Sequence, residues 1–190
     1  MQQPNYKEAL RADIFNYISK ASVALQTESY VIGGFVRDYI LQRETATDVD
    51  IVSVGSGIEL AKKVAALLPN QPKVQVFKTY GTAMLRYEDL EVEFVGARKE
   101  SYASDSRNPT VSSGTLQDDQ NRRDFTINAL ALSLQPDSYG QLLDPFDGLQ
   151  AIKDQTLVTP SAPDITFSDD PLRMLRGIRF ASQLNFQIDA

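Results

Sequence analysis

Along the first half of the chain, segments whose apolar residues are spaced as in a helix alternate with segments spaced as in a strand. No other feature of the sequence restricts the possible folds as strongly as this alternation. Residues 6–26 and 58–68 place apolar side chains every three to four positions, which predicts two amphipathic helices. Residues 30–32 and 49–54 have the composition of short strands, with a helix expected over 35–40. Strands interleaved with helices predict a mixed sheet with helices packed on it, an α/β or α+β architecture.

The second half predicts shorter elements. A hairpin is expected at Glu88-Asp89, between β-rich runs. Residues 99–121 are rich in Ser, Asp and Gln and predict a long loop, of the kind that is functional or disordered. Residues 170–186 have helical spacing, but no partner helix follows, so we expect a truncated chain. Further strands or extended segments are expected at 74–77, 82–87, 90–95, 142–143 and 156–159, and a helical turn at 148–153.

Two residue types are absent from the sequence, and their absence limits the reactions that its side chains can catalyse. The 190 residues include no Cys and no His, which excludes disulfides, zinc knuckles, thiol nucleophiles and His-dependent triads. The net charge of −6 argues against a broadly basic surface, but it leaves room for a local basic cleft. No apolar run approaches the roughly 20 residues of a membrane span, and the N-terminus has no signal-peptide pattern. The cytoplasm is therefore the expected compartment, with no membrane partner.

The pair Asp48 and Asp50 opens the second strand. Residues i and i+2 of a strand share a face, about 6–7 Å apart, so both carboxylates are expected to point the same way. Such a pair favours a cation, and carboxylate oxygens suit Mg²⁺, which also binds substrate phosphates. A solvated turn at the start of the strand is the alternative for this motif taken alone. A third carboxylate, Glu91 or Glu93, belongs to the run 90–95, and periodicity alone does not choose between them.

A glycine pair, Gly33-Gly34, stands between a strand and a helix. Glycine allows close backbone approach, and free amides at a helix start attract phosphate. Arg37 would add a charged donor. The alternative is a tight turn with Arg37 as a surface charge. The P-loop pattern is absent.

Two further groups combine Asp with Arg. Arg123 and Asp124 follow the polar segment and could contact phosphate and ribose, or form a salt bridge and a helix cap. Asp170 and Arg173 are spaced i, i+3, so they would be neighbours on a helix. An acceptor beside a donor complements the pairing edges of cytosine and adenine, and mismatches uracil and guanine. The basic face continues at Arg176 and Arg179.

Together and in this order, these segments resemble the head domain of the class II (bacterial-type) tRNA nucleotidyltransferase and poly(A) polymerase family. The resemblance spans roughly residues 30–186. It implies a polymerase-β-like nucleotidyltransferase head over 1–160 and the start of a helical neck, truncated, over 161–190. It also implies that the chain adds C and A to the 3′ end of tRNA from CTP and ATP, releasing pyrophosphate.

The resemblance assigns roles residue by residue. Asp48, Asp50 and Glu93 match catalytic carboxylates, the first two binding Mg²⁺. The loop with Asp105 and Arg107 matches a flexible element in the switch from C to A. The nucleotide-binding positions are Gly33, Gly34, Arg37, Arg123, Asp124, Asp170, Arg173, Arg176 and Arg179.

Two other functions stay open. One is a poly(A) polymerase or an A-adding enzyme with the same chemistry. Residues 80–85, Tyr-Gly-Thr-Ala-Met-Leu, favour the tRNA enzyme over the poly(A) polymerase, whose relatives carry a Gly-Arg-Arg-Phe-like stretch there. The other is a nucleotide-binding fragment without turnover. Most of the tRNA contacts would come from domains beyond this chain.

Overall fold

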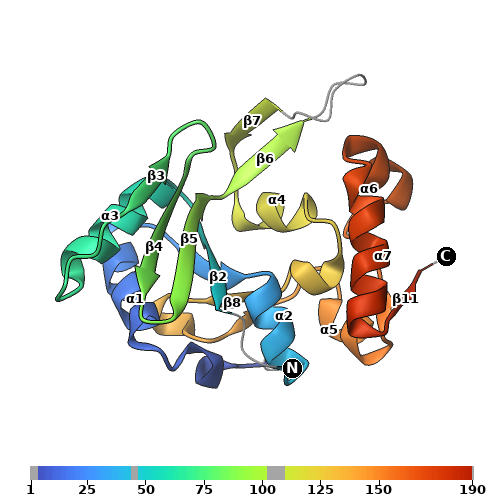
Figure 1. Cartoon of the computed structure of the whole chain (residues 1–190), viewed down its shortest axis with the longest axis horizontal. Coiled ribbons are helices and arrows are strands. Elements are labelled where there is room, and N and C mark those ends of the chain that lie inside the picture. The colour runs from blue at the N-terminus through green and yellow to red at the C-terminus, as the bar shows by residue number, and fades with distance from the viewer. Residues whose placement is uncertain (1–3, 44–46, 102–109, 190) are drawn as a thin grey trace. The chain divides into compact units, whose positions relative to one another are not determined.

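The computed structural model describes residues 4–43, 47–101 and 110–189 (Figure 1). The chain divides into two compact units. The first comprises Met1–Ala97 and Ala131–Leu143, and the second comprises Arg98–Leu130 and Asp144–Ala190. The domain boundary expected after residue 160 stays a prediction.

The first unit is built on a seven-stranded sheet with the order β3-β4-β5-β2-β1-β8-β9. Strands β2 and β5 run parallel and the other neighbours run antiparallel, so the expected mixed sheet is confirmed. The strands are β1 (Ser29–Ile32), β2 (Asp48–Ser53), β3 (Gln75–Phe77), β4 (Thr82–Tyr87), β5 (Leu90–Gly96), β8 (Ala131–Ser133) and β9 (Leu142–Leu143).

Helices α1 (Asp13–Leu25) and α3 (Gly57–Leu67) contact each other, and α3 packs on β4 and β5 (Figure 1). The helix expected over 6–26 is interrupted, because a 3-10 turn over Lys7–Leu10 precedes α1. Helix α2 (Gly34–Ile40) follows β1 and contacts β1 and β2. A short 3-10 turn, η3 (Pro136–Ser138), lies between β8 and β9.

Strand alternation separates the two faces of the sheet. Val49 and Ile51 of β2 are buried, as are their neighbours Val92 and Phe94 on β5. Asp48 on the other face of β2 is exposed and Asp50 is half-buried. Burial of the apolar row, worth about 1.5–3 kcal/mol per large side chain, therefore fixes the face on which the carboxylates lie.

The second unit is mainly helical. It contains α4 (Leu116–Asn121), α5 (Gly148–Lys153), α6 (Pro163–Asp169), α7 (Leu172–Leu184), and a 3-10 turn, η2 (Thr126–Asn128). Its strands form two pairs, β6 (Arg98–Ser101) with β7 (Thr110–Ser113), and β10 (Thr156–Leu157) with β11 (Gln187–Ile188).

One expectation for this unit is wrong. The segment 99–121 is not one long loop, because it contains β7, α4 and most of β6. A capping box between Thr115 and Asp118 starts α4, and the polar composition of the segment hides it. The helix expected over 170–186 is confirmed as α7, which begins at Leu172 and ends at Leu184, with α6 just before it. Within the described residues, none of the helices has both the length and the apolar character needed to cross a membrane.

Candidate active site

The two aspartates of β2 lie on one face of the sheet. In the parallel register, Asp48 is opposite Glu91 and Asp50 is opposite Glu93 on β5. Residues opposite each other in a ladder project to the same side, so all four carboxylates share this face. The first unit thus brings together the three predicted catalytic side chains.

The structure separates the roles of Glu91 and Glu93. Arg86 of β4 is opposite Glu91 and forms an ion pair with it. Glu93 is exposed, its neighbour on β4 is the uncharged Met84, and it makes no ion pair with a described residue. Glu93 is therefore the carboxylate that remains available beside Asp50.

The glycine bend lies at the same end of the sheet as the aspartates. Ile32, the last residue of β1, is opposite Asp50, and Gly33 follows it with φ +83° and ψ −136°. An L side chain rarely adopts this conformation, so glycine is needed to turn the chain from β1 into α2.

Arg37 is not a surface charge, because its side chain is only 6% exposed. Its Nε and Nη2 donate to the two carboxylate oxygens of Asp38, at 2.9 and 2.8 Å. A Cβ built on Gly34 would lie 3.6 Å from Nη2, so the guanidinium folds back against the bend. The pair with Asp38 fixes this charge next to the turn.

The donor set fits a small, hard cation. The described residues contain no group of three or more His, Cys, Asp or Glu side chains arranged to hold a metal. Mg²⁺ is usually held by one or two carboxylates together with waters and substrate phosphates, and does not need a complete protein cage. Asp48 and Asp50, on one accessible face, match that requirement.

In the second unit, the buried carboxylate of Asp119 anchors two arginines. Oδ1 accepts from Nε and Nη2 of Arg122 at 3.0 and 2.6 Å. Oδ2 accepts from Nε and Nη2 of Arg123 at 3.4 and 3.2 Å, and Arg123 also donates to the carbonyl of Asn128 at 3.2 Å. Asp119 was missed by sequence reasoning, although its spacing to both arginines, i+3 and i+4, is that of neighbours on a helix.

The buried carboxylate of Asp124 accepts three hydrogen bonds. Its Oδ1 accepts from the Phe125 amide at 2.9 Å and from Asn128 Nδ2 at 3.0 Å. Its Oδ2 accepts from Arg176 Nε at 2.6 Å. The structure thus brings together two predicted nucleotide-binding residues, Asp124 and Arg176, that lie 52 positions apart in the sequence.

Asp170 and Arg173 lie at the junction of α6 and α7. Asp170 precedes α7, and its Oδ1 accepts from the Leu172 amide at 3.2 Å, so the expectation of two neighbours within one helix is wrong. The Arg173 side chain is buried and donates to the carbonyl of Thr166 at 3.4 Å. Arg179, by contrast, is exposed and lies 4.9 Å from the centre of the Phe180 ring. Asp105 and Arg107 lie outside the described residues.

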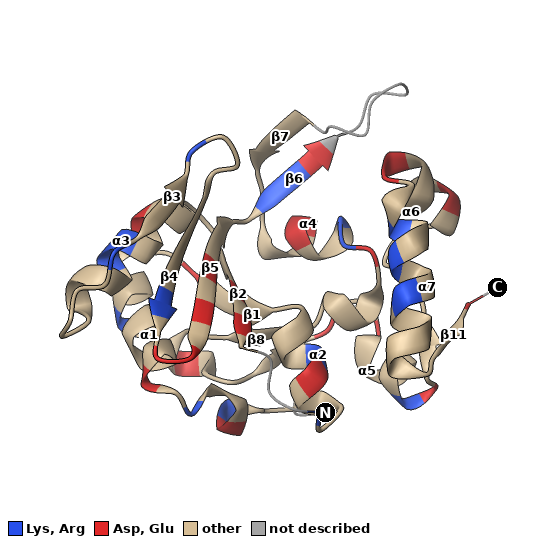
Figure 2. Cartoon of the chain, viewed as in Figure 1, with Lys and Arg blue, Asp and Glu red and all other residues tan. Residues whose placement is uncertain are grey.

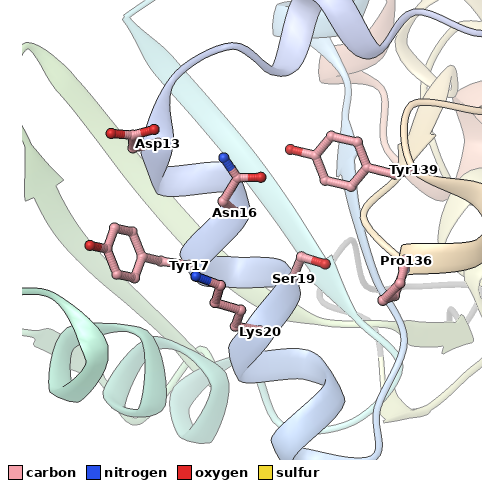
Figure 3. A pocket seen from close by; sticks show the side chains of 7 residues that line it. All are labelled: Asp13, Asn16, Tyr17, Ser19, Lys20, Pro136 and Tyr139. Atoms are coloured by element: carbon pink, nitrogen blue, oxygen red, sulfur yellow. The ribbon is translucent and has the colours of Figure 1, made fainter.

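Two cavities add little to this picture. One of about 130 Å³ in the second unit includes Arg173 and Asp169 in its lining, and is smaller than the roughly 300–1,000 Å³ of most ligand sites. The other, of about 500 Å³, lies between α1 and η3, where the Tyr139 hydroxyl points toward Asn16 (Figure 3). It contains none of the predicted site residues, and burial raises the pKa of Tyr139 to about 12.

The mixed sheet with its paired carboxylates has the polymerase-β-like fold of this class of head domain. Residues 29–158 match the poly A polymerase head domain, and the chain belongs to that family. The sequence-based identification of the family and of the fold class is confirmed.

Similar proteins carry related names. The chain is 42% identical over 160 residues to the A-adding tRNA nucleotidyltransferase of Aquifex aeolicus, covering 84% of this chain and 19% of that protein. It is 37% identical over 163 residues to the CCA-adding enzyme of Anoxybacillus flavithermus, covering 85% of this chain and 38% of that protein. The chain thus spans well under half the length of these relatives.

Solved structures of similarly named proteins resemble this chain in fold. A CCA-adding enzyme in an apo form is similar with a TM-score of 0.88 and 32% identity, covering 100% of this chain and 46% of that one. A tRNA nucleotidyltransferase complexed with a primer tRNA and an incoming ATP analog gives a TM-score of 0.77 and 37% identity, covering 90% and 46%.

Proposed function

We propose that this chain is the catalytic head of an enzyme that adds C and A to the 3′ end of tRNA, using CTP and ATP and releasing pyrophosphate. The observation that carries the proposal is the shared face of Asp48 and Asp50, with Glu93 opposite Asp50. The names of the similar proteins support tRNA as the acceptor and include both CCA-adding and A-adding enzymes.

The chemistry follows from the carboxylate face. The 3′ hydroxyl of the RNA attacks the α-phosphate in line, the bond between the α- and β-phosphates breaks, and pyrophosphate leaves. Glu93, the carboxylate without an ion-pair partner among the described residues, would take the hydroxyl proton. Asp48 and Asp50 would hold Mg²⁺, which when bound neutralises developing charge on the phosphates.

The Arg and Asp side chains of the second unit would contact the nucleotide. Arg179 is exposed and carries no ion pair with a described residue, which suits a phosphate contact. Asp170 and Arg173 would supply an acceptor and a donor that match cytosine and adenine. This assignment predicts that UTP and GTP are poor substrates.

The test is incorporation of labelled CMP or AMP with Mg²⁺, with CTP and ATP offered separately and then together, into tRNA lacking its whole 3′ CCA and into tRNA lacking only the last A. Incorporation of C into the first tRNA from CTP alone, and of A into it only when CTP is also present, supports the proposal. Incorporation of A alone, into the second tRNA only, would identify an A-adding enzyme. Long A tails on unrelated RNA would identify a poly(A) polymerase. Equal binding of all four triphosphates without turnover would contradict the template role of Asp170 and Arg173.

A further inference from the structure

A basic side chain lies on the carboxylate face of the sheet. Arg86 of β4 is opposite Glu91 of β5, and Glu91 is opposite Asp48 of β2, so one row crosses three strands. Opposite residues project to the same side, so Arg86 shares the face of the two aspartates. Figure 2 shows a blue segment on β4 beside red segments on β5 and β2. Among the described residues that the strand registers place on this face, Arg86 alone is basic.

The ion pair of Arg86 leaves most of its donors available. Its Nη2 donates to Oε1 of Glu91, and its Nε and Nη1 make no hydrogen bond with a described residue. A guanidinium carries five N–H donors, and the Arg86 side chain is 73% exposed. An ion pair this exposed stabilises the fold little, so Arg86 can bind a phosphate beside Glu91 or in its place at little cost.

The two aspartates of β2 lie between this arginine and the glycine bend. In the strand order, β1 is on one side of β2, and β5 and then β4 are on the other. The bend at Gly33 and Gly34 follows β1, and the guanidinium of Arg37 folds back against it. The sequence predicts that this bend binds the phosphates of the incoming nucleotide. A triphosphate at the bend and the Arg86 side chain would therefore lie on opposite sides of the aspartates.

The in-line geometry of the proposed reaction assigns one side of the aspartates to each substrate. The attacking hydroxyl and the leaving pyrophosphate lie on opposite sides of the α-phosphate. If pyrophosphate leaves toward the bend, the RNA 3′ hydroxyl must approach from the side of β5 and β4. Glu93, which would take the hydroxyl proton, is exposed on β5. Arg86 lies one strand further out, two strand spacings or about 10 Å from Asp48, where the last phosphate of the RNA would lie.

We propose that Arg86 binds the phosphodiester at the 3′ end of the acceptor RNA and so positions the attacking hydroxyl. The last nucleotide of any RNA is joined through such a phosphate, so the contact requires no unpaired nucleotides upstream and reads no base. Arginine suits this contact because its planar fork of donors matches two phosphate oxygens. The proposal rests on the proposed function, because it places the acceptor of that reaction.

The test measures KM separately for the acceptor and for the nucleotide. Each protein is given tRNA lacking its 3′ CCA or only its last A, with Mg²⁺ and the triphosphate that wild type adds to that tRNA. We expect R86Q to raise the KM for tRNA by about 10-fold, the scale of one hydrogen bond to a charged group, and to leave the KM for the triphosphate within about 2-fold. R86K keeps the charge but loses the fork, so its KM for tRNA should lie between those of wild type and R86Q.

The salt dependence gives a second readout, which a merely structural role would not move. A phosphate contact releases counterions, so R86Q should reduce the slope of log kcat/KM for tRNA against log salt by roughly 0.7. R86K keeps the charge and should keep the slope. Denaturant unfolding of both variants checks that they are folded.

The chain offers a matched control in Lys62, an exposed cation whose Nζ lies 3.0 Å from Oε1 of Glu59. Lys62 belongs to α3, which covers the apolar face of β4 and β5. K62Q removes the same charge as R86Q, away from the carboxylate face, and should keep both KM values and the salt slope of wild type. Equal KM values for tRNA in R86Q and K62Q would overturn the proposal.

The same measurements separate this proposal from the proposed function. If wild type adds nucleotide and the KM for tRNA is unchanged in R86Q, Arg86 does not bind the acceptor and the proposed function stands. A rise in the KM for the triphosphate, alone or together with that for tRNA, would also overturn the proposal, because Arg86 would then act on the nucleotide or on the whole site. If wild type adds no nucleotide to either tRNA, the proposed function fails and this proposal fails with it.

Discussion

Asp50 of β2 lies directly opposite Glu93 of β5 in the parallel register, and the next pair along the same face, Asp48 and Glu91, is followed on β4 by Arg86. The ion pair with Arg86 engages Glu91 and leaves Glu93 beside Asp50. We therefore expect Glu93→Gln to reduce nucleotide incorporation by roughly 100-fold, the scale of losing one group that acts on the reacting atoms. Glu91→Gln is the matched control, and little change is expected because its pair is exposed. Equal losses in both variants would contradict the separate roles.

The bend before α2 gives a second prediction. Gly33 has φ +83° and ψ −136°, whereas a Cβ on Gly34 would meet only Arg37 Nη2 at an ordinary 3.6 Å. Gly33→Ala should lower the free energy of unfolding by about 1–3 kcal/mol, because alanine is strained there. Gly34→Ala should leave it nearly unchanged. Denaturant unfolding of both variants checks this, and a larger loss for Gly34→Ala would show that the bend is described wrongly.

The Asp119 network should be costly to break. Its buried carboxylate accepts from both Arg122 and Arg123. Asp119→Asn leaves Arg123 without its ion-pair partner and leaves Arg122 with Glu100 alone, so we expect a loss of about 3–5 kcal/mol in unfolding free energy. Asp164→Asn, an exposed position in the first turn of α6, is the control and should cost less than about 0.5 kcal/mol. A loss in Asp119→Asn no larger than in this control would contradict the network.

The capping box of α4 predicts an acid-sensitive contribution to stability. Hydrogen bonds from the amide and then the hydroxyl of Thr115 lower the pKa of Asp118 below its usual 3.8. Because the folded pKa is the lower one, the stabilisation is fully present above about pH 3.8 and disappears as the pH falls through the folded pKa. Wild type should therefore be more stable than Asp118→Asn at pH 7, and the difference should shrink below pH 3.8. A difference that stays constant down to pH 2 would argue against the cap.

The sequence predicts some of this arrangement well. Alternation along β2 is a local property, so the shared face of Asp48 and Asp50 can be inferred without a structure, and the structure confirms it. The strand, bend and helix around Gly33 are local for the same reason. These elements follow from apolar spacing and from glycine, which act within a few residues.

The remaining features depend on contacts between distant residues. Periodicity could not choose between Glu91 and Glu93, because the choice depends on Arg86 across the β4–β5 pair. The contact of Asp124 with Arg176 joins residues far apart in the chain. Helix α4 was missed because its sequence, Leu-Gln-Asp-Asp-Gln-Asn, lacks an apolar stripe, and the capping box and the buried Asp119 pairs stabilise it instead.

The central claim is that Asp48 and Asp50 carry the reaction from one face of the sheet. The most direct measurement is incorporation of labelled nucleotide into tRNA lacking its 3′ CCA, with Mg²⁺, by wild type, Asp48→Asn, Asp50→Asn and the control Glu91→Gln. The account predicts losses of at least roughly 100-fold in each aspartate variant, with unfolding free energies close to wild type, and near-normal incorporation in the control. Incorporation by either aspartate variant at the rate of Glu91→Gln would contradict it.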